Sequence, residues 1–169
     1  GGGNNCESYT LPWYFAAEHT AIDCYEKRKK LGYLFTVGDE ELPSKLKAVH
    51  VLKFLGDGQQ DDIDTRDLLA LVSRRYEIFH LVVTEGNYAR SNLDRVMSSW
   101  TAVLGQRVLP LRDHRKLAEV IVSAIEVNEG RAVDAVAKSW GGDTSVVVRD
   151  ALTSLTPRTA PATGVIRFR

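Results

Sequence analysis

The chain has 169 residues, of which 44% are apolar, and its 22 basic and 22 acidic side chains give a formal net charge of zero. This length and composition are typical of one packed domain, and the balanced charge gives no general attraction to nucleic acid or anionic membranes. No run approaches the roughly 18 apolar residues of a membrane span, and we expect no secretory signal. The expected partners therefore include neither nucleic acid nor a membrane, and the expected location is cytoplasmic.

Two cysteines, Cys6 and Cys24, lie at opposite ends of a predicted helix. A helix rises about 1.5 Å per residue, so it separates them far beyond the ~7 Å Cα limit for a disulfide. We expect two free thiols in a reducing compartment. The basic run 27–30 is interpreted as the cationic end of that helix.

The first half of the chain alternates helical and strand-like patterns. Helical spacing of apolar residues begins between Ser8 and Leu11, after which Tyr33–Val37 is apolar at nearly every position. Continuous apolarity predicts a central parallel strand that is buried on both faces. Ser44 is a predicted helix cap, and either Asp64 or Thr65 is predicted to cap the helix that follows it. The predicted elements are a helix over 8–28, a strand over 33–37, a helix over 45–55 and a helix over 65–75.

The second half repeats the alternation and then becomes helical. Pro110 places the last predicted strand at a sheet edge, and His80 is interpreted as a core histidine whose hydrogen bonds are satisfied. The predicted elements are strands over 78–83 and 107–111, helices over 92–104, 116–128, 132–140 and 144–155, a linker over 156–164, and an edge strand or docked tail over 165–169. This order predicts an α/β fold, a Rossmann-like three-layer α/β/α arrangement with a mainly parallel sheet, over residues 1–127. Residues 128–169 are expected to form a helical extension and tail.

Polar residues occur in two loops at positions where α/β folds bind ligands. A Gly-rich loop, Gly1–Ser8, opens the first helix and carries Asn5 and Glu7, and the first strand ends at Gly38 and Asp39. Ligands of open α/β sheets lie beyond the carboxyl ends of the strands, near helix N-termini. The two loops therefore predict one ligand site.

With these markers, Gly1-Gly2-Gly3 with Glu7 and then Gly38-Asp39-Glu40, residues 1–127 resemble the second half of a von Willebrand factor A domain of the bacterial, cytoplasmic type. The resemblance implies a divalent cation in a metal-ion-dependent adhesion site, with Mg²⁺ usual and Mn²⁺ or Ca²⁺ as alternatives. Asp39 matches the family's third-loop carboxylate, and Asn5 and Glu7 are the other candidate ligands. A protein partner is implied, and bacterial relatives often work with ATPases of the AAA class.

The sequence departs from the family pattern in two respects. It contains no Asp-x-Ser-x-Ser motif, and the Gly-rich loop offers no Thr. We therefore expect a missing half-domain, in the same or another chain, that also supplies the strand beside Tyr33–Val37. Without it, an apolar central strand has an open edge. The isolated chain is then not expected to fold as a stable monomer.

Alternatives remain open at each site residue. Asp39 is either a metal ligand or a loop carboxylate that caps the next helix, and Asn5 and Glu7 either contact metal or cap a helix N-terminus. The first functional reading is a metal-dependent protein-binding module that recognises a partner carboxylate. The alternative is a small metal-assisted α/β hydrolase with Asp39 as ligand and Glu40 as general base, for which the sequence offers no convincing nucleophile.

Overall fold

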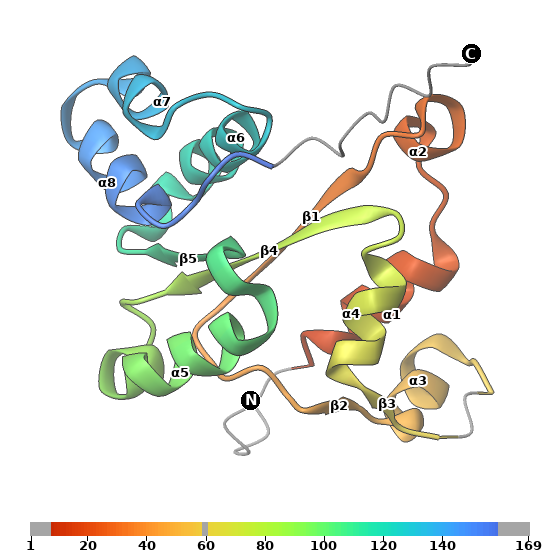
Figure 1. Cartoon of the computed structure of the whole chain (residues 1–169). Coiled ribbons are helices and arrows are strands. Elements are labelled where there is room, and N and C mark those ends of the chain that lie inside the picture. The colour runs from red at the N-terminus through yellow and green to blue at the C-terminus, as the bar shows by residue number, and fades with distance from the viewer. Residues whose placement is uncertain (1–7, 59–60, 159–169) are drawn as a thin grey trace, which may run out of the picture. The chain divides into compact units, whose positions relative to one another are not determined.

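The computed structural model describes residues 8–58 and 61–158 (Figure 1). It contains two compact units, Gly1–Arg115 and Lys116–Arg169, which are described separately. This division precedes the expected boundary at residue 127, because the helix before that boundary packs with the two helices that follow it. The Gly-rich loop with Asn5 and Glu7, and the predicted strand over 165–169, lie outside the described residues.

A three-stranded sheet organises the first unit. Its order is β1 (Gly32–Gly38), β4 (Tyr76–Val83) and β5 (Val108–Leu111), and both pairings are parallel. Phe35 of β1 lies beside Phe79 of β4. An α/β fold with a Rossmann-like parallel sheet is therefore confirmed, and β5 is an edge strand as predicted.

Among the described residues β1 has the open edge that was expected where the half-domain is missing, and it is not buried on both faces. β4 pairs with one side of β1, and no other described strand pairs with it. Leu34 and Phe35 are half-buried and Val37 is 38% exposed, whereas β4 is buried along nearly its whole length. An apolar sequence is necessary for burial on both faces, but neighbours on both sides are needed to achieve it.

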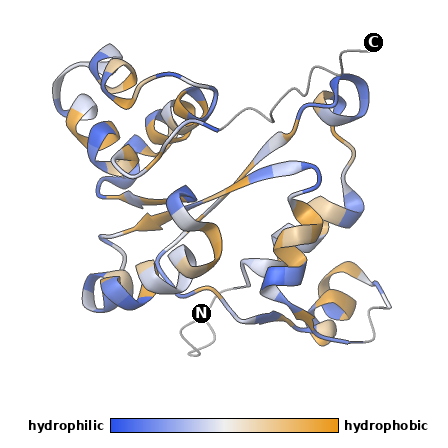
Figure 2. Cartoon of the chain, in the orientation of Figure 1, coloured by the Kyte–Doolittle hydropathy of each residue, from blue (hydrophilic) through white to orange (hydrophobic). Residues whose placement is uncertain are grey.

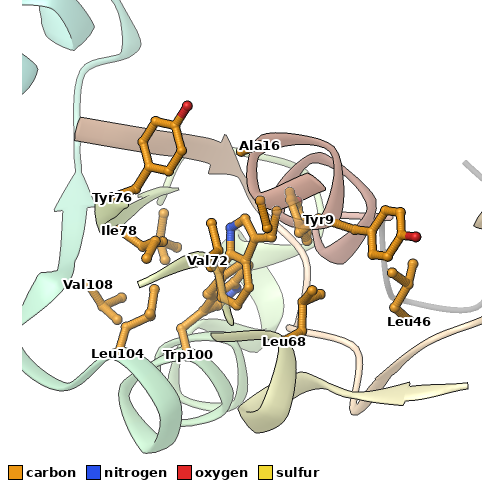
Figure 3. Close-up of a cluster of buried hydrophobic side chains, with 14 of the residues drawn as sticks. Tyr9, Ala16, Leu46, Leu68, Val72, Tyr76, Ile78, Trp100, Leu104 and Val108 are labelled. Atoms are coloured by element: carbon orange, nitrogen blue, oxygen red, sulfur yellow. The ribbon is translucent and has the colours of Figure 1, made fainter. Parts of the chain in front are cut away.

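Three helices pack on one face of the sheet around a shared core (Figure 3). They are α1 (Thr10–His19), α4 (Thr65–Val72) and α5 (Ala89–Leu104). Trp13 of α1 and Trp100 of α5 are fully buried in this core. Burial of indole rings supplies much of the hydrophobic driving force for such packing.

The predicted helix over 8–28 is instead two helices, α1 and α2 (Asp23–Arg28). Thr20 between them is extended, with φ −120° and ψ 143°, and its hydroxyl lies 2.5 Å from the Ala16 carbonyl oxygen. Arg75 donates hydrogen bonds to the carbonyls of Ala17 and Thr20. The carbonyls left at the end of α1 are therefore satisfied by a tertiary contact, which local sequence does not show.

The predicted helix over 45–55 begins later than expected. Its first residues form β2 (Lys45–Leu46), which pairs antiparallel with β3 (Ile63–Asp64). The helix α3 then covers Ala48–Leu55, and the Ala48 N–H donates to Asp62 Oδ1 at 3.0 Å. Asp62 thus takes the capping role that was predicted for Ser44.

Two further helix boundaries can be compared with prediction. Asp64 caps α4 as expected, accepting a hydrogen bond from the Arg66 N–H at 2.8 Å, although α4 ends at Val72 rather than at residue 75. The helix α5 starts at Ala89 and is kinked at Asn92, where φ is −136°. The helix therefore begins three residues before the predicted start at Asn92.

The helix α3 is hydrophobic along most of its length (Figure 2). Only Val51 is buried, while Val49, Leu52 and Phe54 are more than half exposed. An apolar helix surface of this kind is uncommon on a soluble monomer.

The second unit contains α6 (Leu117–Asn128), α7 (Val133–Trp140) and α8 (Gly142–Leu152), all within a few residues of their predicted bounds. The Trp140 indole N–H donates to Ser123 Oγ at 2.7 Å, and the Arg158 N–H donates to the Asn128 carbonyl. None of the described helices combines the length and apolar character needed to cross a bilayer.

Candidate metal centre

The loop at the carboxyl end of β1 is held by hydrogen bonds from α5. The Trp100 indole N–H donates to the carbonyl oxygen of Glu40 at 2.9 Å. The Tyr88 hydroxyl donates to Glu41 Oε1 at 2.7 Å, and Arg95 forms an ion pair with the same carboxylate at 2.9 Å. The loop is thus fixed to a helix instead of being a mobile connection.

Asp39 lies at the centre of this loop. Its Oδ2 accepts a hydrogen bond from the Tyr88 N–H at 2.9 Å, immediately before α5. Asp39 is therefore bonded to the residue that precedes α5, and its predicted role as a cap of the next helix along the chain is not observed. Among the described residues no group donates to Asp39 Oδ1, so this oxygen is available to a ligand.

Gly86 allows the close approach of the two loops. A Cβ at this position would overlap the side chain of Asp39, so any larger residue would displace that carboxylate. Glycine is required here for space, since it has no side chain to collide with Asp39.

A cavity of about 460 Å³ opens beside Asp39, at the carboxyl ends of β1 and β4. This is where ligands of parallel α/β sheets bind. Its lining residues are Gly38, Asp39, Glu40, Val83, Gly86, Asn87 and Tyr88.

A cluster of buried aromatic rings packs against the loop at the carboxyl end of β1. The His80 ring lies flat on Trp100, with centroids 3.4 Å apart and planes 6° apart, and Tyr9 packs edge-on against both rings. The Tyr9 ring also contacts Gly38, where no side chain would fit. The loop therefore rests on a rigid, buried base.

His80 lies in the core as predicted, but it is not a fully satisfied histidine, because its buried Nε2 has no hydrogen-bond partner among the described residues. It is fully buried, and its Nδ1 lies 2.8 Å from Thr36 Oγ1. Burial lowers the pKa of His80 to about 3, because the apolar surroundings disfavour the charged ring. His80 is therefore neutral at physiological pH.

A second group of polar side chains lies at the carboxyl ends of β4 and β5. The potential ligand atoms of Glu85, Asp113 and His114 lie within 4.8 Å of one another, and His114 Nδ1 is 3.0 Å from Glu85 Oε1. Hydrogen bonds from His114 lower the pKa of Glu85, and those from Arg115 lower the pKa of Asp113 to about 2. Both carboxyl groups are therefore ionised, but the Arg115 guanidinium already occupies both oxygens of Asp113.

The Asp39 site fits Mg²⁺ in part. Mg²⁺ is commonly held by one or two carboxylates and retains several waters, and Asp39 Oδ1 beside a cavity offers one such ligand. Glu40 contributes its carbonyl to Trp100, and Glu41 is held by Tyr88 and Arg95. The structure does not bring Asn5 and Glu7 to this site, because both lie outside the described residues.

The site offers little support for hydrolytic chemistry. The described residues that line the cavity include no serine, cysteine or histidine, and the one hydroxyl, that of Tyr88, is bonded to Glu41. A nucleophile and a proton-transfer partner are required for the hydrolase alternative.

Sequence reasoning named Asp39 as a candidate ligand, which stays a prediction, and it did not name the residues that position this side chain. Trp100, Tyr88 and Gly86 act through contacts across 47 to 60 positions of sequence, or through space that only the fold defines. Glu85 and Asp113 were also missed, although both follow predicted strands of one parallel sheet, and that rule would have located them.

Comparison with protein-family models, with curated proteins and with solved structures found no match to this chain.

Proposed function

We propose that this chain is a divalent-cation-dependent protein-binding module of the von Willebrand factor A type. In this proposal Asp39 holds Mg²⁺, with Mn²⁺ or Ca²⁺ as alternatives, and a carboxylate of a protein partner completes the coordination. The observation that carries the proposal is the position of Asp39. One of its oxygens is fixed by the Tyr88 N–H, and the other is available beside a cavity at the carboxyl end of the sheet.

Rigidity favours binding over catalysis at this site. The loop is held by Trp100 and Tyr88, so the carboxylate loses little conformational entropy when a cation binds. A partner carboxylate needs only an open coordination position on the cation, whereas hydrolysis would also need Glu40, which lines the cavity, to act as general base.

Further parts of the proposal follow the family resemblance. Asn5 and Glu7 would add ligands from the Gly-rich loop, and the remaining ligands would come from a half-domain in the same or another chain. An ATPase of the AAA class is the proposed partner, and the proposed location is cytoplasmic. The free thiol of Cys24 agrees with a reducing compartment.

Calorimetric titration of the full chain with MgCl₂ tests the cation site. We expect Asp39→Asn, which preserves the shape of the side chain, to weaken Mg²⁺ binding at least about tenfold. Asp67→Asn is the matched control, because Asp67 is an exposed carboxylate in the first turn of α4 and its loss changes the charge equally. Equal Mg²⁺ affinity in both variants would contradict the proposal.

The same samples separate the two candidate functions and the two candidate sites. If Glu85→Gln or Asp113→Asn abolished Mg²⁺ binding while Asp39→Asn did not, the cation site would be the group formed by Glu85, Asp113 and His114. Hydrolysis of a phosphoester by the chain alone, abolished by Asp39→Asn, would replace the binding module with the hydrolase.

A further inference from the structure

Two basic segments that are far apart in sequence meet at the amino end of the sheet. One closes α2 and leads into β1, with three consecutive cations at 28–30, and the other is the turn before β4. The Gly32 N–H donates to the Arg75 carbonyl at 2.8 Å, and this bond joins the two segments. We call the surface formed by their exposed cations the basic end, and its residues are Arg28, Lys29, Lys30 and Arg74.

Packing at this end of the sheet holds α2 beside the start of β1 (Figure 1). A Cβ on Gly32 would lie 2.7 Å from the Ile22 side chain and 3.1 Å from the Tyr76 ring, so the residue before α2 contacts the starts of β1 and β4. The Tyr76 hydroxyl lies 2.6 Å from Thr20 Oγ1, and Arg75 donates to the Thr20 carbonyl at 3.1 Å. The two basic segments are therefore parts of one surface.

The cations of the basic end are exposed, and most of them are unpaired. Within residues 8–58 and 61–158, Arg28, Lys30 and Arg74 form no ion pair and no side-chain hydrogen bond. Lys29 lies over the Tyr25 ring, with its Nζ 5.5 Å from the ring centroid. Three positive charges are therefore available to a partner, and a fourth lies beside them.

The nearby acidic side chains neutralise other cations. Asp23 of α2 forms an ion pair with Lys27 at 2.7 Å, and Glu77 of β4 forms one with Arg107. Glu26 is the one acidic residue of α2 that has no such pair in the described part of the chain. The basic end therefore carries an excess of positive charge, although the formal charge of the whole chain is zero.

The backbone of Lys29 also sets this segment apart. Its φ is 54°, the one positive φ of a non-glycine residue in the described chain. The N–H groups of Lys29 and Lys30 donate to the carbonyls of Tyr25 and Cys24, a pattern that ends helices and usually places glycine at the residue with positive φ. A lysine here adds a charge to the basic end where the backbone would favour glycine.

We propose that the basic end binds an acidic segment of a protein partner. Carboxylates of successive aspartate or glutamate residues would pair with its guanidinium and ammonium groups. Asp39 lies at the opposite end of β1, and a strand of seven residues spans roughly 20 Å. The basic end is therefore a protein contact separate from the proposed cation site.

The aromatic residues near the basic end do not suit nucleic acid. Single strands bind by stacking their bases on accessible rings. Tyr25 is covered by Lys29, Tyr76 is buried, and Tyr33 is half-buried and stacks on Phe35. A long polyanion would also gain nothing from the rest of a chain with no net charge, whereas a short acidic segment needs only this surface.

A membrane surface is less favoured because the basic end has no apolar side chain to insert. Figure 2 shows α2 and the turn before β4 as largely hydrophilic. None of the exposed large apolar side chains of the described chain lies on either segment. Stable membrane anchoring needs a second signal beside a cluster of cations.

Fluorescence anisotropy of a fluorescein-labelled octaglutamate peptide, titrated with the full chain, tests the proposal. We expect saturable binding in about 50 mM NaCl that weakens at least about tenfold in 500 mM NaCl, because salt screens pairs of exposed charges. EDTA in the buffer removes divalent cations, so the result does not depend on Mg²⁺ binding at Asp39. Absence of saturable binding at the lower salt concentration would overturn the proposal.

Charge reversal locates the binding surface. Lys30→Glu and Arg74→Glu should each weaken peptide binding at least about fivefold, whereas Arg74→Lys keeps the charge and should stay within about twofold of the original. Lys138→Glu is the matched control, because Lys138 is an exposed cation of α7. All these side chains are exposed, and circular dichroism checks that the variants are folded.

Two results of this series would overturn the proposal. Equal weakening in Lys138→Glu would show that the peptide responds to the charge of the whole chain. Weakening in Lys30→Glu but not in Arg74→Glu would show that the two segments do not act as one surface.

Competition identifies the class of partner. An octathymidylate strand has a similar charge but carries bases, and vesicles that contain phosphatidylserine present an anionic membrane. We expect both to bind more weakly than octaglutamate at equal salt concentration. Displacement of the peptide by equimolar octathymidylate, or retention of the chain on vesicles in excess peptide, would overturn the proposal in favour of nucleic acid or a membrane.

Discussion

The strands β1 and β4 have similar apolar sequences but different environments. β4 lies between two strands and is buried from Tyr76 to Val82, whereas β1 has one described neighbour and is half-buried. Their aromatic residues make the contrast direct, since Phe35 and Phe79 are register partners. Composition therefore indicates that a strand is suited to the interior, while its neighbours decide how much of it is buried.

The two strands nevertheless build one site together. β1 ends at Asp39, and β4 ends just before Gly86 and Tyr88, which fix that carboxylate. The better buried strand thus supplies the support, and the less buried strand supplies the candidate ligand.

Replacing Phe35 or Phe79 by alanine should give the largest difference between the two strands in the stability that is lost. We expect Phe79→Ala to lower the free energy of unfolding by about 3–5 kcal/mol, because Phe79 is fully buried. Phe35→Ala should cost about 1–2 kcal/mol, because Phe35 is only partly buried and keeps some contact with water. Urea unfolding followed by circular dichroism, at concentrations where the chain is monomeric, measures both. Equal losses would mean that β1 is buried as deeply as β4.

The buried His80 of β4 should make stability depend on pH. Its pKa is about 3 in the folded chain and 6.5 in the unfolded chain, so between these values only the unfolded chain binds a proton. Stability is therefore full above pH 6.5 and falls as the pH is lowered, by up to about 1.4 kcal/mol per pH unit. Urea unfolding at a series of pH values measures the slope.

His80→Phe keeps a ring against Trp100 and removes the titrating group, so it should flatten this dependence. His50→Gln, on partly exposed α3, should leave it unchanged. A slope that survives in His80→Phe would show that other groups cause it.

Gly86→Ala tests how closely the two strand ends approach. The added Cβ would overlap Asp39, so we expect a loss of about 1–3 kcal/mol in stability and weaker Mg²⁺ binding together. Gly58→Ala is the control, because a Cβ there meets nothing within 4 Å. Urea unfolding and Mg²⁺ titration measure the two effects, and unchanged Mg²⁺ affinity in Gly86→Ala would separate Asp39 from the cation.

The smallest effect on stability is expected at the group formed by Glu85, Asp113 and His114. Arg115 holds the pKa of Asp113 at about 2 through hydrogen bonds, so Arg115→Ala should raise that pKa toward 3.8 without measurably changing stability. Titration of the Asp113 carboxyl carbon by NMR measures the shift. An unchanged pKa would show that the guanidinium does not pair with Asp113 in solution.

Much of the fold was predictable because local patterns decide it. The strands at 33–37 and 78–83, the Asp64 cap and the helices of the second unit depend on periodicity and on neighbouring residues. The break at Thr20 was not predictable, because it is stabilised by Arg75 from another part of the chain. The strand at Lys45 depends likewise on a pairing with residues 63–64.

Of the residues at the candidate site, the sequence indicated Asp39, and its role as a metal ligand stays a prediction. Asp39 follows an apolar strand, which is a pattern that sequence reveals. Its anchoring by Tyr88 and the support from Trp100 depend on how α5 packs against the sheet. The edge position of β1 depends on strand order, which periodicity does not encode.

Anomalous diffraction from crystals of the full chain soaked in MnCl₂ tests the central claim most directly, because Mn²⁺ replaces Mg²⁺ and scatters anomalously. The account predicts an anomalous peak about 2.1 Å from Asp39 Oδ1, beside the Gly86 loop. A peak at Glu85, Asp113 and His114 with none at Asp39, or no ordered ion at the carboxyl end of β1, would contradict it.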